Sequence, residues 1–145
     1  ATERSQHLMS LGIPLNTDST LKGQTVFLAE RCGELMHDNI ITDRTVLDVM
    51  AFTLNANSIP HQDKTSFEEY ANEFIREYDY IFYISPHGIE IEDNGVRETD
   101  EHYRDLIDFT ITTLIKRHGH KAGTIEKISG STDERIQQIL TITGL

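Results

Sequence analysis

Three short segments of the sequence combine polar or charged side chains with the start of a predicted helix. Carboxylates can hold hydrated Mg²⁺, arginines bind phosphates through paired hydrogen bonds, and amides at a helix start bind anions. Together these groups would suit the binding and transfer of a phosphate. The segments are Thr42-Asp43-Arg44, the stretch 85–99 with Arg97 and the following Arg104, and Ser129-Gly130-Ser131.

The first segment has two interpretations. Asp43 follows a short β-branched run, residues 39–42, that is typical of a buried strand, and Arg44 begins a predicted helix. At the end of such a strand, Asp43 would orient Mg²⁺ and Arg44 would contact a phosphate or a substrate hydroxyl. The alternative is structural, with Asp43 as the helix N-cap and Arg44 paired with Asp48 one turn later.

The second and third segments also have two interpretations each. The loop at about 86–99 contains two glycines and four acidic residues, and long loops in compact domains are commonly functional. Arg97 just before a helix would let this loop close over phosphates as a lid. Alternatively, Arg97 pairs with the acidic residues of its own loop. Ser129-Gly130-Ser131 would line a base or bind an anion, or is an ordinary turn.

Helical and strand-like patterns alternate along the chain. This alternation predicts an α/β fold with a parallel sheet and helical crossovers. Three strands are few for such a sheet, and the first helix has no strand before it, so we expect one or two further strands upstream. The predicted helices cover residues 3–11, 19–38, 44–54, 67–78 and 100–118 and a last segment that starts at Thr132, and the predicted strands cover 39–42, 79–85 and 124–128, with loops at 55–64 and 86–99.

The composition limits the class of protein. A length of 145 residues with 37% apolar residues fits one domain, 1–145. The net charge of −11 argues against broad nucleic-acid binding, although a few arginines in a cleft can still hold an anion. No apolar run approaches the ~18 residues of a membrane span, the first residues do not have the pattern of a signal peptide, and Cys32 is the single cysteine. We therefore expect a cytoplasmic, soluble protein without a membrane partner; the sequence gives no oligomeric state.

The run from Ile40 to Phe52 resembles the strand–Asp-Arg-Ser/Thr–x-x-Asp–x-x-Ala-Tyr/Phe segment of small AAA-type P-loop ATPases. That family is similar to nucleoside and nucleotide kinases and to the kinase domain of the bifunctional nicotinamide-nucleotide regulator, and many members are phage-encoded. Further matches follow the order of the family's motifs. They are Glu3-Arg4, residues 78–84 with Pro86, the lid-like run 93–103, and residues 128–131 with Glu134-Arg135.

The resemblance implies a P-loop kinase-like three-layer sandwich with a parallel sheet, whose first strand and phosphate-binding loop would precede Ala1. No Gly-x-x-x-x-Gly-Lys-Ser/Thr motif occurs in the 145 residues. It implies ATP and Mg²⁺ as cofactors. The implied roles are Asp43, Arg44, Arg97 and Arg104 in catalysis, Asp43 also at Mg²⁺, Ser129, Gly130 and Ser131 around the adenine, and Glu3, Arg4 and Asp48 on the substrate side.

Two classes of function remain open. The first is an ATP-dependent phosphotransferase acting on a nucleoside, nucleotide or related small metabolite, and the family's acceptor pocket would correspond to residues around 13–37 and 53–66. The second is a nucleotide-binding or pseudo-enzyme interaction module without catalysis. A phage kinase acting on modified DNA bases is a weaker alternative, which the acidic charge disfavours.

Overall fold

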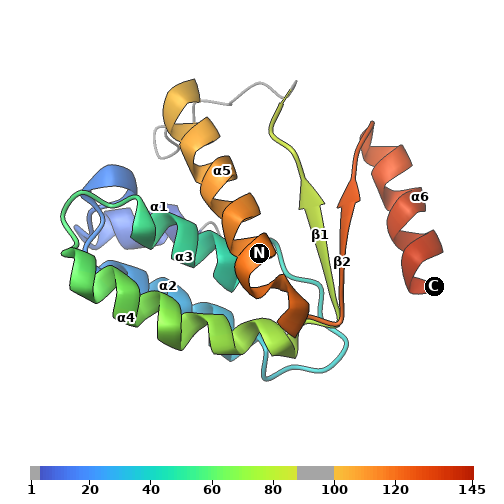
Figure 1. Ribbon diagram of the computed structural model, residues 1–145, viewed down its shortest axis with the longest axis horizontal. Helices are drawn as coiled ribbons and strands as arrows, with labels where there is room; N and C mark the ends of the chain where they lie inside the picture. Colours follow the sequence, from blue (N-terminus) through green and yellow to red (C-terminus); the bar gives the residue numbers. More distant parts are fainter. Residues whose placement is uncertain (1–3, 88–99) are drawn as a thin grey trace.

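The computed structural model describes residues 4–87 and 100–145 (Figure 1). Its helices pack around a short sheet. The elements are α1 (Arg4–Ser10), η1 (Asn16–Asp18), α2 (Leu21–Glu34), α3 (Val46–Leu54), α4 (His61–Ala71), η2 (Asn72–Glu77), β1 (Tyr80–Ile84), α5 (Glu101–His118), η3 (Gly119–Lys121), β2 (Thr124–Ile128) and α6 (Thr132–Thr143), where η marks a 3₁₀ helix.

The two strands form a parallel pair. Tyr80 is opposite Thr124 and Ile84 is opposite Ile128. Parallel neighbours need a long crossover, and α5 lies in the connection between them (Figure 1). This arrangement confirms the predicted mixed α/β class, and both strands begin and end within one residue of the predicted ranges.

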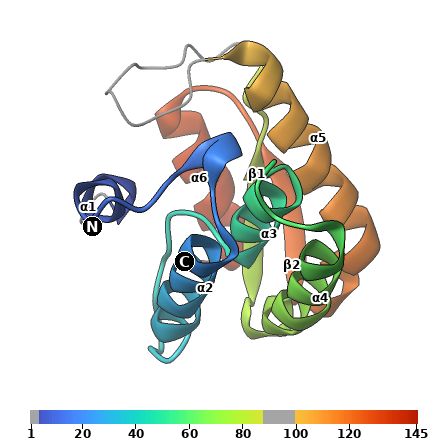
Figure 2. The ribbon, with the colours of Figure 1, turned by 90° about the vertical axis from the view of Figure 1, so that its left-hand side faces the viewer.

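Helix α3 lies at the centre of the core. Its sequence is apolar nearly all round, as expected of a helix with neighbours on several sides. Val46, Met50 and Ala51 are completely buried. Helices α2, α4 and α5 all contact α3, and Figure 2 shows it between them. The hydrophobic core is therefore built around α3, with residues of α2, α4 and α5 packed against it.

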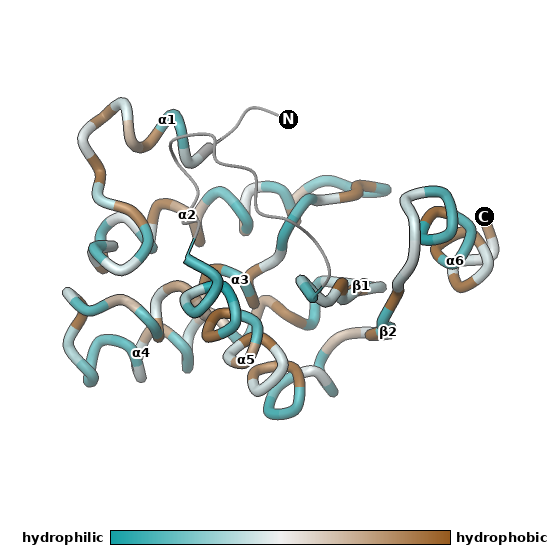
Figure 3. Tube along the Cα trace, turned by 90° about the horizontal axis from the view of Figure 1, so that it is seen from above, coloured by the Kyte–Doolittle hydropathy of each residue, from teal (hydrophilic) through white to brown (hydrophobic). Residues whose placement is uncertain are grey.

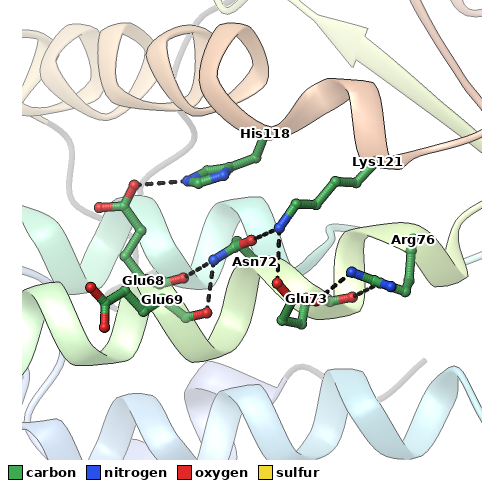
Figure 4. Close-up of polar contacts among 7 residues, drawn as sticks. All are labelled: Glu68, Glu69, Asn72, Glu73, Arg76, His118 and Lys121. Atoms are coloured by element: carbon green, nitrogen blue, oxygen red, sulfur yellow. Dashed lines mark hydrogen bonds and ion pairs between the residues drawn. The ribbon is translucent and has the colours of Figure 1, made fainter.

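A polar network ties α5 to α4 (Figure 4). The Glu68 carboxylate lies 2.9 Å from His118 Nε2 and also pairs with Arg117. Beyond it, Lys121 Nζ donates to Asn72 and, at 3.0 Å, to Glu73. Since these groups join the end of α5 and η3 to α4 and η2, they fix the crossover helix over the helical layer.

Two of the predicted elements are wrong. Residues 39–42 form no strand: the backbone bends at Asn39, which has a φ of 54°, and Ile41 is 93% exposed. A strand needs a neighbour to satisfy its amides and carbonyls, and neither described strand pairs with this segment. β-branched composition alone did not distinguish an exposed extended segment from a buried strand.

The second error concerns α4. The helix begins at His61, within the predicted loop 55–64, because Pro60 at the N-cap presets the backbone for a helix start. The Thr65 hydroxyl donates to the His61 carbonyl inside the helix and does not cap it. The helix also ends earlier than predicted, at Ala71, and continues as the 3₁₀ helix η2.

Helix α6 lies at the periphery, next to β2 (Figure 1). It begins at Thr132, the predicted start of this segment, and its N-cap is Ser131. Hydrophobic residues recur along it (Figure 3), yet Ile136 remains 47% exposed and Leu140 37%. Helix α6 is therefore only loosely attached to the core that α3 organises.

Candidate functional site

The parallel pairing brings two of the three predicted segments to one edge of the sheet. Because Ile84 is paired with Ile128, the residues that follow, Ser85 and Ser129, leave the sheet side by side at its carboxyl edge. This is the edge where ligands bind in open parallel α/β folds. The described starts of these two segments are thus neighbours, and the rest of the predicted arrangement stays a prediction.

The first predicted segment, Thr42-Asp43-Arg44, instead forms with Thr45 the junction that precedes α3. Buried Arg31 of α2 donates from Nη1 to the Asp43 carbonyl at 2.8 Å and pairs with Glu34 at 3.1 Å. Arg44 has a φ of 78°, which is strained for a residue with a side chain. The Thr42 hydroxyl donates to the Arg44 carbonyl at 3.0 Å, which holds this conformation.

The Asp43 and Arg44 side chains are both exposed at this junction. The Arg44 guanidinium lies 5.7 Å from the centre of the Phe52 ring, a cation–π distance. Neither side chain caps α3: Thr45 is the N-cap, and the Asp48 carboxylate accepts from the Thr45 N–H at 2.8 Å. The structural alternative, with Asp43 as cap and Arg44 paired with Asp48, is therefore wrong, and Asp48 is engaged within the helix start.

The start of α3 contacts the amino end of β1. The Val46 N–H donates to Tyr78 Oη at 3.3 Å, and Tyr78 precedes β1 by two residues. Burial raises the pKa of Tyr78 to about 12, so its phenol stays protonated. This contact does not join the junction to the turns at the carboxyl edge.

Side chains of α6 make hydrogen bonds with the backbone of the Ser129–Ser131 turn. The Gln138 amide accepts from the Ser129 N–H at 3.2 Å and donates to its carbonyl at 2.7 Å. The Glu134 carboxylate accepts from the Ser131 N–H at 2.6 Å. These hydrogen bonds from Ser131 lower the pKa of Glu134. An adenine or anion at this turn would compete with both side chains, so its predicted role stays a prediction.

A cluster that the sequence analysis missed lies beside this edge. Tyr83 Oη donates to Asp108 Oδ1, and Asp108 Oδ2 lies 3.9 Å from His87 Nε2. The three residues come from β1, from the loop that follows it, and from α5. Asp108 interrupts the apolar run Ile107–Phe109 near the helix middle, and this was the one sequence signal that could have marked it.

The other predicted site residues are Arg97, Glu3, Arg4 and Arg104. Arg97, with the lid-like segment, and Glu3 lie outside the described residues. Arg4 lies in α1. Arg104, in the first turns of α5, has its Nε 3.5 Å from the Asp105 carboxylate. Over residues 4–87 and 100–145, no three His, Cys, Asp or Glu side chains gather as a metal site.

An apolar hollow of about 340 Å³ lies between α2 and the end of α4. Burial raises the pKa of the Cys32 thiol in its wall, which keeps the sulfur protonated and poorly nucleophilic. Its α2 wall falls within the range 13–37 expected of an acceptor pocket. The lining residues are Thr25, Leu28, Ala29, Cys32, Tyr70 and Phe74.

No protein-family model, curated protein or solved structure matches this chain significantly. In the part of the chain that the structure describes, no helix is both long and apolar enough to cross a membrane. Function must therefore be inferred from the geometry of the junction and of the carboxyl edge.

Proposed function

We propose that this chain forms the scaffold and acceptor side of an ATP-dependent phosphotransferase with a P-loop kinase-like parallel sheet. The observation that carries the proposal is the Thr42–Thr45 junction. It presents an exposed carboxylate and an exposed guanidinium on adjacent residues, fixed from beneath by buried Arg31. Strained non-glycine backbone, as at Arg44, is found preferentially at functional sites.

The residue types suit phosphoryl transfer. The Asp43 carboxylate would hold Mg²⁺ through its water ligands, and the Arg44 guanidinium would neutralise charge on the transferred group. Arg97 would act from the lid-like segment and Arg104 from α5. The backbone cradle for the β- and γ-phosphates would come from residues outside the 145, because the sequence contains no glycine-rich lysine motif. The acceptor would be a nucleoside, a nucleotide or a related small metabolite.

The test uses the full-length gene product that carries this chain. ATP consumption is measured with Mg²⁺ and a panel of nucleosides, nucleotides and small metabolites. We expect turnover with at least one acceptor, and we expect Asp43→Asn and Arg44→Gln to lower kcat ~100-fold. Asp43→Asn should leave Tm unchanged, and Arg44→Gln should lower it only through the lost contact with the Phe52 ring. The control is Asp38→Asn, an exposed carboxylate in the same connection. Absence of ATP consumption with every acceptor would contradict the proposal.

A second candidate is a nucleotide-binding or interaction module without catalysis. One observation favours it: the hollow between α2 and the end of α4 is lined mainly by apolar side chains, which suit contact with a partner better than contact with phosphates. Calorimetry with Mg-ATP separates the two functions. Binding without turnover, unaffected by Asp43→Asn, would favour the module.

A further inference from the structure

The Asp108 carboxylate is an enclosed acidic group beside the carboxyl edge of β1. Its side chain is 15% exposed, whereas the His87 imidazole opposite it is 69% exposed. Tyr83 approaches from β1, His87 from the loop after β1, and Asp108 from α5. Three polar side chains from three separate segments thus meet at one point. Their meeting is a product of the tertiary fold and not of the local sequence.

The two oxygens of Asp108 have different surroundings. Oδ1 accepts the hydrogen bond of Tyr83. Burial, together with the neighbouring carboxylate, raises the pKa of Tyr83 to about 12, so the phenol remains a donor at physiological pH. Oδ2 faces His87 Nε2 at 3.9 Å, which is too long for a direct hydrogen bond. Polar groups at such a separation are commonly bridged by a third group.

We infer that Asp108 Oδ2 and His87 Nε2 together bind one hydroxyl group of a neutral ligand. A hydroxyl has one donor and two acceptor lone pairs. It would donate to the carboxylate and accept from the imidazole N–H, with its oxygen about 2.8 Å from each. A phosphate oxygen would be repelled by the carboxylate, and with the His87 proton on Nε2 an ammonium group would find no acceptor on that side.

This inference rests on the proposed function and narrows its acceptor. The site adjoins the edge where parallel α/β folds bind ligands, so the bound hydroxyl would be one that holds the acceptor molecule in place. The acceptor is then an alcohol, such as the sugar of a nucleoside or a polyol. A nucleotide that accepts through its own phosphate does not fit the charge of Asp108.

The first experiment needs no ATP. Backbone amide NMR shifts of the 145-residue chain are followed during titration with ribose and, separately, with ribose 5-phosphate. We expect ribose to cause saturable shifts at His87 and Asp108, and ribose 5-phosphate to bind more weakly. Asp108→Asn, which keeps the side-chain shape, and His87→Gln, at an exposed position, should each weaken ribose binding ~10-fold.

The matched control is Glu101→Gln, an exposed carboxylate on the same helix, which should leave the titration unchanged. Equal shifts with both sugars, no shifts with ribose, or undiminished ribose binding by Asp108→Asn would each overturn the hydroxyl site. Far-UV circular dichroism checks that each variant is folded.

The second experiment separates this inference from the proposed function. The full-length gene product is assayed for ATP consumption with nucleosides and with the matching 5′-monophosphates. Consumption with nucleosides, and a KM raised ~10-fold by Asp108→Asn, supports both proposals. Preference for monophosphates overturns the hydroxyl site and leaves the phosphotransferase standing. Absence of consumption overturns the phosphotransferase, and the ribose titration then still decides the hydroxyl site.

Discussion

Helices α3 and α6 start in the same way and contribute very differently to the molecule. Each begins with a capping box, Thr45 with Asp48 in α3 and Ser131 with Glu134 in α6. Six of the nine residues of α3 are buried, whereas none of the 12 residues of α6 is. A capping box therefore specifies where a helix begins, and the neighbours of that helix decide how much stability it contributes.

The residues that precede the two helices also differ in how firmly the surrounding structure holds them. Arg44 and Gly130 both adopt positive φ, 78° and 95°. The conformation is easily adopted by glycine and unfavourable for arginine. At Arg44 it is held by the Thr42 hydroxyl and lies beside Asp43, whose carbonyl Arg31 anchors. Because strain persists only where surrounding structure enforces it, the α3 junction is the stronger functional candidate of the two.

The largest expected difference between the two helices is in core packing. Met50→Ala in α3 removes a completely buried side chain and should lower the free energy of unfolding by about 2–5 kcal/mol. Leu140→Ala in α6, where the side chain is 37% exposed, should cost less than about 1 kcal/mol. Urea denaturation followed by circular dichroism measures both. Equal losses would mean that α6 is part of the same core.

Local patterns predicted some of these features and not others. The strands at 79–85 and 124–128 and the helix over 100–118 followed from apolar runs, periodicity and turn residues. The segment 39–42 did not become a strand, because pairing depends on a neighbour that composition does not reveal. Arg31 under the Asp43 carbonyl and Asp108 beside Tyr83 were also missed. Each interaction joins residues at least 12 positions apart, and no local pattern encodes such a contact.

Removal of each N-cap should give a smaller effect that again differs between the helices. Thr45→Ala loses the hydroxyl that accepts from the Leu47 N–H at 3.1 Å. It should lower global stability by about 1 kcal/mol. Ser131→Ala loses the equivalent bond to Glu134 but should mainly increase fraying of α6. Amide hydrogen exchange checks this. Faster exchange confined to α6 is expected for Ser131→Ala, and loss of protection across the core would contradict it.

Acidification should affect the core and helix α6 through two different carboxylates, Glu68 of α4 and Glu134 of α6. Although burial opposes the shift, hydrogen bonds from His118 and Arg117 lower the pKa of Glu68 below its ordinary value of 4.5. A lowered folded-state pKa stabilises the fold above pH 4.5, and this contribution disappears as pH falls through the lowered value. The pKa of Glu134, in the N-terminal cap of α6, is also lowered, so its contribution to stability is likewise lost at low pH.

Between pH 7 and about pH 3, wild-type protein should therefore lose more of its free energy of unfolding than Glu68→Gln does. The difference between the two losses should be less than about 1 kcal/mol. Urea titrations at the two pH values measure this difference. Glu134→Gln should alter only the pH dependence of amide exchange in α6. An identical pH dependence in wild type and Glu68→Gln would show that the network in Figure 4 adds no stability through ionisation.

The smallest expected effect tests the strain at the α3 junction directly. Arg44→Ala and Arg44→Gly both lose the contact with the Phe52 ring, but only glycine relieves the positive φ. We expect Arg44→Gly to be more stable than Arg44→Ala by about 0.5–1 kcal/mol, the reverse of the order in ordinary helical or extended backbone. Thermal unfolding of the two variants gives the sign. If alanine were the more stable, the backbone at Arg44 would not be strained in solution, and the proposed site would lose the observation that distinguishes it from the α6 turn.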